Sequence, residues 1–195
     1  MKAKLILENG MVFEGKAFGH LKDSVGEVVF TTGMTGYQEV LTDPSYYGQI
    51  VTMTYPQIGN YGINLEDMES DSPKVRGFIV REKCNLPNNF RCELELEDFL
   101  KQNKIVGLEG IDTRALTKVL RNNGTMRGII AIDELDKSDI DEKIKSFSNK
   151  EDVKTVTTKK PYTVEGKGKH VAVIDFGIKQ NILRCFKKRG CKLTV

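Results

Sequence analysis

Residues 25–56 read VGEVVFTTGMTGYQEVLTDPSYYGQIVTMTYP. Their first part, Val25–Thr31, is rich in apolar and β-branched side chains, which predicts a strand buried on at least one face. Gln49–Tyr55 has the same character and predicts a second strand, which Pro56 ends because proline lacks the N–H that a sheet ladder uses. A segment with helix and turn signals joins the two. The stretch therefore indicates a domain that mixes strands with short helices.

The joining segment holds a helix signal and then a stop. Thr35 and Gln38 match the T-x-x-Q capping box, so we expect a short helix to begin near Gly36. The helix should end by Asp43, because Pro44 disfavours helical backbone at the residue before it. The residue after this stop is predicted to lie on an exposed turn.

Ser45 occupies that turn and is the candidate binding residue. A serine hydroxyl beside free backbone N–H groups can hydrogen-bond a ligand carboxylate or ammonium group. The alternative is a serine that only caps its own turn, and local physical chemistry by itself favours this alternative. The residue types alone therefore leave the role of Ser45 open.

The flanking sequence predicts an α+β domain. Residues 4–15 alternate apolar and polar side chains around Asn9-Gly10, a pair that can supply the two positive φ angles of a type I′ hairpin. Further strands are expected at Val75–Arg81, Ile105–Leu108 and Arg127–Ile132, with Gly107 and Gly128 as candidate bulge points, and helices at about Glu95–Gln102, from Asp112 to Gly124, and after Ser138. This order favours a mixed or antiparallel sheet over a series of βαβ repeats.

The composition changes near residue 150. From 150 to 169 apolar periodicity is lost and Lys, Thr and Gly dominate, so we predict one domain over 1–149 and a linker over 150–169. Residues 170–177 then read HVAVIDFG, a near-continuous apolar strand of the kind that parallel sheets bury on both faces.

A second domain is expected to begin with that strand. A helix at about 179–188 and a strand at 191–195 would complete one βαβ unit within residues 170–195. A single unit cannot cover its own apolar faces, because a parallel sheet needs helices on both sides. We therefore expect the unit to be the incomplete start of an α/β domain, and to be mobile or to lean on the first domain.

Charge is unevenly distributed along the chain. Residues 1–149 carry 18 Lys and Arg against 23 Asp and Glu, whereas residues 150–195 carry 12 against 4. No interleaved aromatic residues accompany the lysines, so a solvated basic face is favoured over a nucleic-acid surface. No apolar run approaches the roughly 18 residues of a membrane span, and no secretory signal is recognisable. We expect a cytoplasmic protein without membrane or nucleic-acid partners.

Neither a metal site nor a catalytic nucleophile is predicted. The four cysteines, expected to be reduced, are Cys84, Cys92, Cys185 and Cys191. None has the small residues two places before and after it that a strand-to-helix nucleophile elbow requires. The two histidines, His20 and His170, lie far apart, and no G-x-x-x-x-G-K-[ST] phosphate loop occurs. We therefore expect no metal or cofactor in this chain.

A series of short segments runs along nearly the whole chain: LENG at 7–10, FEG at 13–15, GEVVF at 26–30, MTGYQE at 34–39, TDPSY at 42–46, YP at 55–56, IDTR at 111–114, DFG at 175–177, NILR at 181–184 and RGC at 189–191. In this order and spacing the segments resemble the small subunit of glutamine-dependent carbamoyl-phosphate synthetase. Each segment is weak evidence alone, but their order and spacing make the series specific.

The resemblance implies an N-terminal domain of swivelling β/β/α type, followed by the truncated start of a class I glutamine amidotransferase domain. In that family a Cys-His-Glu arrangement, expected here only after Val195, hydrolyses L-glutamine. Ammonia then passes to a large subunit, which uses ATP and Mg to make carbamoyl phosphate from bicarbonate for pyrimidine and arginine biosynthesis. The family serine that matches Ser45 helps to bind glutamine, which turns the balance toward a binding role.

Two other functions remain to be distinguished from this one. The chain could be a non-catalytic module that docks on the large subunit, and a stop codon directly after Val195 would favour that alternative. Nucleic-acid binding by the basic C-terminal stretch is the least favoured, and it would require retention on DNA with a steep salt dependence. On the main hypothesis, the chain as given is expected to be inactive as a glutaminase.

Overall fold

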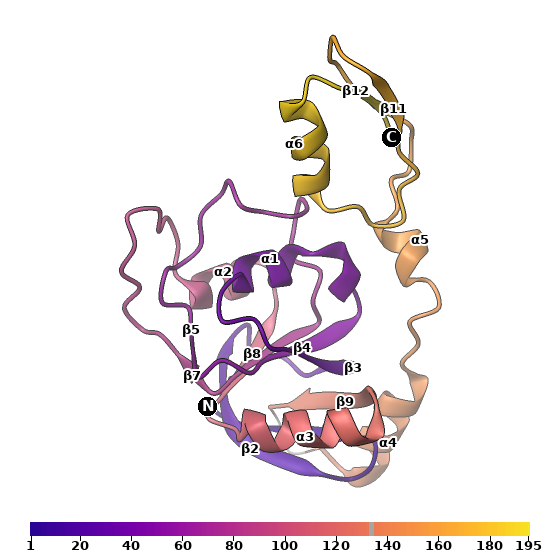
Figure 1. Cartoon of the computed structure of the whole chain (residues 1–195). Coiled ribbons are helices and arrows are strands. Elements are labelled where there is room, and N and C mark those ends of the chain that lie inside the picture. Colours follow the sequence, from indigo (N-terminus) through magenta and orange to yellow (C-terminus); the bar gives the residue numbers. More distant parts are fainter. Residues whose placement is uncertain (133–134) are drawn as a thin grey trace.

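A computed structural model describes residues 1–132 and 135–195, and within them seven strands close into a barrel (Figure 1). In order around the barrel these are β1 (Lys2–Leu7), β2 (Val12–Gly19), β8 (Val106–Glu109), β6 (Gly77–Val80), β4 (Gln49–Met53), β3 (Ser24–Thr31) and β9 (Met126–Ala131). The pairs β3–β4, β4–β6 and β6–β8 are parallel, and the other four are antiparallel. The predicted α+β class with a mixed sheet is confirmed.

Helices and a small extra sheet surround the barrel. They are α1 (Tyr37–Thr42), the 3-10 turn η1 (Pro44–Tyr46), α2 (Leu96–Gln102), α3 (Thr113–Asn123), α4 (Lys137–Ser146), and the paired strands β5 (Gln57–Ile58) and β7 (Glu82–Lys83). Asp112 caps α3 as predicted, because its side chain accepts the N–H of Ala115 at 2.9 Å. Gly124, with a φ of 83°, follows the end of that helix.

The barrel strands serve two cores because successive side chains of a strand point to opposite faces. Ile50 and Ile79 belong to the cluster that also contains Leu116 of α3. Their neighbours Val51 and Phe78 belong to the cluster beneath α1 and α2. All four of these strand residues are fully buried. Residues on both faces of one sheet therefore hold the helices in place.

The first hairpin forms, but its turn differs from the prediction. β1 and β2 pair antiparallel, with Ile6 opposite Val12. Gly10 has a φ of 84°, whereas Asn9 does not adopt positive φ, so the turn is not type I′. The N–H of Gly10 instead bonds to the carbonyl of Leu7 at 2.8 Å, and the Asn9 side chain accepts the N–H of Met11. The Asn9 side chain thus helps to close a turn in which Gly10, but not Asn9, has left-handed backbone.

Gly107 and Gly128 were predicted as bulge points, and this was wrong. The strand ladders run through both residues without an inserted residue. A Cβ on Gly107 would lie 2.4 Å from the ring of Phe18, and one on Gly128 would lie 2.8 Å from Val28. Both glycines therefore mark a close approach of neighbouring groups rather than a bulge.

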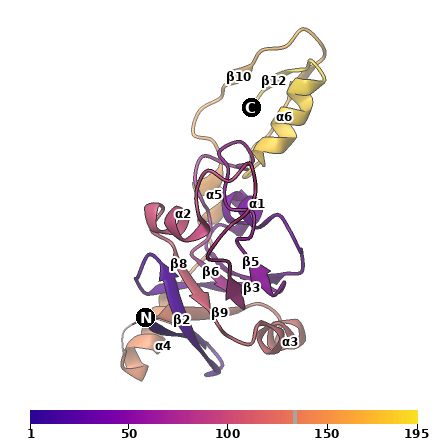
Figure 2. The ribbon, with the colours of Figure 1, turned by 90° about the vertical axis from the view of Figure 1, so that its left-hand side faces the viewer.

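The C-terminal unit, residues 162–195, stands beyond α1 at one end of the barrel (Figures 1 and 2). It contains β10 (Thr163–Val164), β11 (His170–Ala172), α6 (Gln180–Lys188) and β12 (Lys192–Thr194), and the short helix α5 (Asp152–Val156) precedes it. β11 and β12 are parallel and α6 connects them, so the predicted βαβ unit is present. β10 adds an antiparallel edge.

The strand expected to be buried on both faces is not. β11 spans only three residues, and the side chains of Ile174 and Phe176 are 81% and 70% exposed. Within the described chain, β11 pairs only with β12 and lies at the edge of its sheet. The apolar run therefore lacks the neighbours that would bury it.

Among the described residues, no helix has both the length and the apolar character to cross a membrane.

Candidate functional site

Ser45 lies on an exposed turn, as predicted, between α1 and β4. Asp43 precedes this turn and its Oδ1 accepts the N–H of Ser45 at 2.9 Å. Pro44 sits at the first position of η1, where its missing N–H costs nothing. In the part of the chain that the structure describes, the Ser45 hydroxyl makes no hydrogen bond. The turn is capped by Asp43, which leaves the hydroxyl of Ser45 available to a ligand.

The second oxygen of Asp43 reaches the C-terminal unit. Its Oδ2 lies 2.7 Å from Nζ of Lys179, the residue before α6. Asp43 is only 5% exposed, so the ion pair is shielded on one side. Hydrogen bonding to Asp43 raises the pKa of Lys179 above its ordinary value, although partial burial opposes the shift. One carboxylate therefore holds both the Ser45 turn and the entry to α6.

Thr42 makes a second connection from the same end of α1. Its hydroxyl donates to the carbonyl of Gln38 at 3.0 Å and accepts the N–H of Glu69 at 2.9 Å. The hydroxyl of Ser70 donates in turn to the carbonyl of Thr42. Residues 69 and 70 are thereby fixed to the helix that leads into the Ser45 turn.

Glu69 and its neighbour contact the first turn of α6. The carbonyl of Glu69 accepts the N–H of Gln180 at 2.9 Å, and its carboxylate accepts the N–H of Asn181 at 3.0 Å. One turn further on, the guanidinium of Arg184 donates to the carbonyl of Met68 at 2.7 Å. Helix α6 is thus hydrogen-bonded to the barrel by backbone and side-chain groups.

Asp175 shapes the part of the C-terminal unit that packs against Pro44. Its carboxylate accepts the N–H groups of Gly177, Ile178 and Thr158 at 2.7–2.8 Å. Burial by itself raises the pKa of Asp175, but these three bonds outweigh burial and hold it below its ordinary value. Gly177 has a φ of 100°, and a Cβ there would lie 3.2 Å from Cβ of Pro44. The turn therefore fits closely beside the Ser45 turn.

The predicted capping box at the start of α1 does not form. The helix begins after Gly36, which has a φ of 82°, and no side chain from the helix caps it. The amide of Gln38 bonds instead to the backbone of Asn64, donating to its carbonyl and accepting its N–H. A long-range partner has displaced the local one, because a buried amide must satisfy both its donor and its acceptor.

Tyr61 supplies the missing cap and was not found by sequence reasoning. Its hydroxyl accepts the N–H groups of Gly36 and Tyr37 at 2.7 and 3.2 Å, and its ring stacks on Tyr37 with centroids 4.2 Å apart. The hydroxyl of Tyr37 donates to the carbonyl of Gly62 at 2.6 Å. Burial raises the pKa of both tyrosines, so both stay neutral near pH 7. A tyrosine 24 residues away in sequence thus orients α1 and the Ser45 turn after it.

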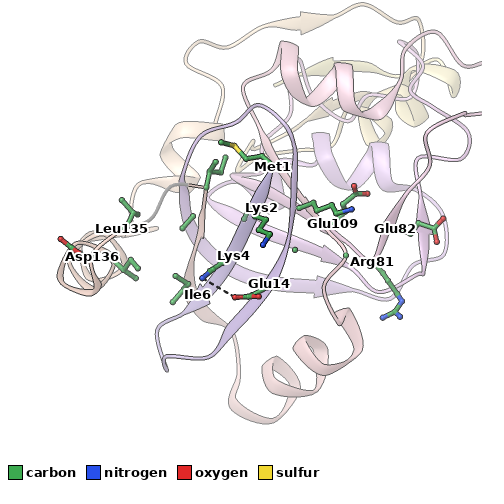
Figure 3. Close-up of a pocket in the computed structure, with 17 residues that line it drawn as sticks. Met1, Lys2, Lys4, Ile6, Glu14, Arg81, Glu82, Glu109, Leu135 and Asp136 are labelled. Atoms are coloured by element: carbon green, nitrogen blue, oxygen red, sulfur yellow. Dashed lines mark ion pairs between the residues drawn. The ribbon is translucent and has the colours of Figure 1, made fainter.

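A separate hollow lies among β1, β2, β8 and the region before α4 (Figure 3). It has a volume of about 1270 Å³, and its lining mixes lysines and Arg81 with Glu14, Glu82 and Glu109. One internal ion pair joins Lys4 to Glu14 at 3.4 Å. The residues that join α1 to the C-terminal unit, among them Asp43, Glu69 and Lys179, form the junction, and none of these three lines the hollow.

Two other kinds of site, a metal centre and a cysteine placed as a nucleophile, are absent from the described residues. Within 1–132 and 135–195 no group of three or more His, Cys, Asp and Glu side chains could hold a metal ion. The four cysteines are unpaired and partly buried. Cys185 lies within α6 and the other three lie in connecting segments, so none stands on a strand-to-helix elbow.

The fold defines a class of protein with two parts, in which a barrel with a mixed sheet meets a βαβ unit at a polar junction between α1 and α6. A family model described as "Carbamoyl-phosphate synthase small chain, CPSase domain" matches residues 5–130. The chain therefore belongs to the carbamoyl-phosphate synthase small chain family. The resemblance drawn from the sequence is confirmed.

Curated relatives agree with this membership. The chain is 73% identical over 195 residues to the "Carbamoyl phosphate synthase small chain" of Clostridium perfringens, covering 100% of this chain and 56% of the relative. It is 52% identical over 196 residues to the protein of that name from Bacillus caldolyticus, and 50% identical over 199 residues to the "Carbamoyl phosphate synthase pyrimidine-specific small chain" of Bacillus subtilis. Both alignments cover 100% of this chain and 54% of the relative. The chain spans about half the length of these relatives.

Proposed function

We propose that this chain forms the N-terminal half of a small subunit that releases ammonia from L-glutamine and delivers it to the large subunit of carbamoyl-phosphate synthetase. The observation that carries the proposal is the family match over residues 5–130 together with the position of Ser45. Its hydroxyl is unbonded within the described chain and lies on a turn that is tied to the C-terminal unit through Asp43. Glutamine would bind between the two parts.

On this proposal Ser45 binds and does not react. Its hydroxyl would hydrogen-bond the α-carboxylate or α-ammonium group of glutamine, since both groups match a hydroxyl that can donate and accept. The nucleophile is expected beyond Val195, where a thiolate would attack the side-chain amide carbon and release ammonia. Water would then hydrolyse the thioester to glutamate.

We further propose that the barrel is a domain of the swivelling β/β/α type over residues 1–149. Residues 150–169 would be the linker, and residues 170–195 the start of a class I amidotransferase domain. The family match over residues 5–130 and the βαβ topology of the C-terminal unit support this division. ATP and Mg would bind the large subunit. The setting would be the cytoplasm, and the names of the relatives favour pyrimidine biosynthesis over arginine biosynthesis.

The test uses the full-length small subunit together with the large subunit. Ser45→Ala should raise the glutamine KM while the rate with ammonia, which bypasses the small subunit, stays the same. Ser138→Ala is the matched control, because Ser138 is exposed on α4 and lies outside the junction. An unchanged glutamine KM in Ser45→Ala would remove Ser45 from the binding site.

A second candidate is a docking module without chemistry of its own. It is favoured by the absence of any cysteine on a nucleophile elbow within the described residues. The two candidates differ in the gene after Val195. A reading frame that continues into a Gly-x-Cys-x-Gly elbow and a later histidine supports the enzyme subunit, whereas a stop codon supports the module.

A further inference from the structure

We infer that Glu69 is a positioning residue: it caps helix α6 from the barrel and so sets where the C-terminal unit stands relative to Ser45. The inference rests on the proposed function, because the separation between α6 and the Ser45 turn, which Glu69 would fix, sets the width of the proposed glutamine site. Glu69 is not placed in contact with the ligand. Two sets of hydrogen bonds support this role: one joins Glu69 to α6 and the other joins it to α1.

The first contact is the cap itself. A helix begins with N–H groups that have no partner inside the helix. The residue before α6 is Lys179, whose side chain has no acceptor, and no side chain from its own segment caps the helix. Glu69 supplies acceptors for two of these N–H groups, with its carbonyl on Gln180 and its carboxylate on Asn181. A carboxylate at this end also interacts favourably with the helix dipole.

The second contact fixes Glu69 to the barrel. The side chain of Glu69 is 8% exposed, and a carboxylate so enclosed requires hydrogen-bond partners. Its backbone N–H donates to the hydroxyl of Thr42, the last residue of α1. Thr42 is followed directly by Asp43 and the Ser45 turn. The path from Ser45 to α6 therefore runs through a few short, directed hydrogen bonds.

This arrangement couples the capping of α6 to the docking of the C-terminal unit on the barrel. A helix capped by its own segment keeps its cap wherever it moves, whereas α6 loses both acceptors when the C-terminal unit leaves the barrel. Separation would also leave the Glu69 carboxylate without its partner on Asn181. Helix α6 is therefore capped by Glu69 only when the C-terminal unit is docked on the barrel, and other positions of the unit are disfavoured because they lack this cap.

The inference is tested first by amide hydrogen exchange on the 195-residue chain. Glu69→Ala should speed exchange at Asn181 roughly tenfold, the factor that one capping bond is worth. Glu69→Gln keeps an acceptor oxygen and should recover most of the protection. Glu66→Ala is the matched control, because Glu66 is an exposed acidic residue of the same loop that pairs with Arg91 and, within the described residues, makes no hydrogen bond or ion pair with α6. Unchanged exchange at Asn181 in Glu69→Ala would overturn the cap.

The second readout is the glutamine KM of the full-length subunit bound to the large subunit. Glu69→Ala should raise this KM several-fold without changing the ammonia-driven rate, Glu69→Gln should lie near wild type, and Glu66→Ala should equal wild type. Faster exchange at Asn181 with an unchanged KM would overturn the positioning role. If Ser45→Ala also leaves the KM unchanged, the proposed function itself has failed, and the exchange data still decide whether Glu69 caps α6.

Discussion

The barrel and the C-terminal unit are built from the same kinds of elements but are stabilised differently. In the described chain the barrel has two large clusters of buried side chains, many of them with no exposed surface. The C-terminal unit has one cluster with three buried members, Leu183, Leu193 and Val195. It also leaves Ile174 and Phe176 in solvent. The barrel is therefore held by its own core, whereas the C-terminal unit depends on its contacts with the barrel.

The largest difference between the two regions is expected when a buried leucine is truncated in each. Leu108→Ala removes a fully buried side chain from the barrel and should cost about 2–5 kcal/mol of unfolding free energy. Leu183→Ala removes the same atoms from the small cluster and should leave the main urea transition almost unchanged. It should instead release the C-terminal unit, seen as faster exchange over residues 170–195. Equal shifts of the main transition by both variants would contradict the distinction.

A smaller effect is expected where the barrel orients the site. Tyr61→Phe removes the hydroxyl that accepts two N–H groups at the start of α1, leaving partly buried donors without their partner. The loss should be about 1–3 kcal/mol in urea unfolding. Tyr55→Phe is the control, because Tyr55 is 39% exposed and its hydroxyl makes no hydrogen bond within the described residues. If the two variants unfold alike, Tyr61 does not cap α1.

The smallest predicted effect concerns the turn of the C-terminal unit that packs against Pro44. Asp175→Asn replaces Oδ2, which accepts the N–H of Thr158, by a group that can present a donor there. We expect a loss of about 1 kcal/mol in the stability of the unit, read from amide exchange at Gly177 and Ile178. Asp139→Asn, on the exposed face of α4, should have no effect.

The pH dependence of this turn follows from the same bonds. Hydrogen bonding holds the pKa of Asp175 in the folded chain below its unfolded value of about 3.8. Its contribution to stability is therefore complete well above pH 3.8 and is lost as the pH falls through the lowered folded pKa. Amide exchange at Gly177 should quicken in acid beyond the intrinsic pH effect. In Asp175→Asn this extra acid response should be absent, and its persistence there would assign it to another group.

Local signals in the sequence predicted the elements that depend on local contacts. The strands β3 and β4, the Asp112 cap of α3 and the exposed turn at Ser45 all follow from residues within a few positions. The capping box at Thr35 and Gln38 failed because Gln38 found a buried partner at Asn64, 26 residues away. Local propensity is a weak guide where a tertiary contact competes with it.

The junction could not be predicted for a related reason. Its decisive bonds join groups far apart in the chain, such as Glu69 to Asn181 over 112 residues. A lone Glu in a polar loop carries no local sign that it will cap a distant helix. The only available hint was the lysine at the start of α6, a position where a side-chain acceptor is usually found. Ser45 could be proposed from the sequence because its turn is local and because the family resemblance implies a binding role for it.

Native-state hydrogen exchange across the 195-residue chain measures whether the C-terminal unit depends on docking beside Ser45. We predict slow exchange in β4 and β6, fast exchange in β11 and β12, and intermediate protection at Gln180 and Asn181 that falls in Glu69→Ala. Uniformly slow exchange over residues 170–195, unaffected by Glu69→Ala, would show that the C-terminal unit is stable without its contacts to the barrel.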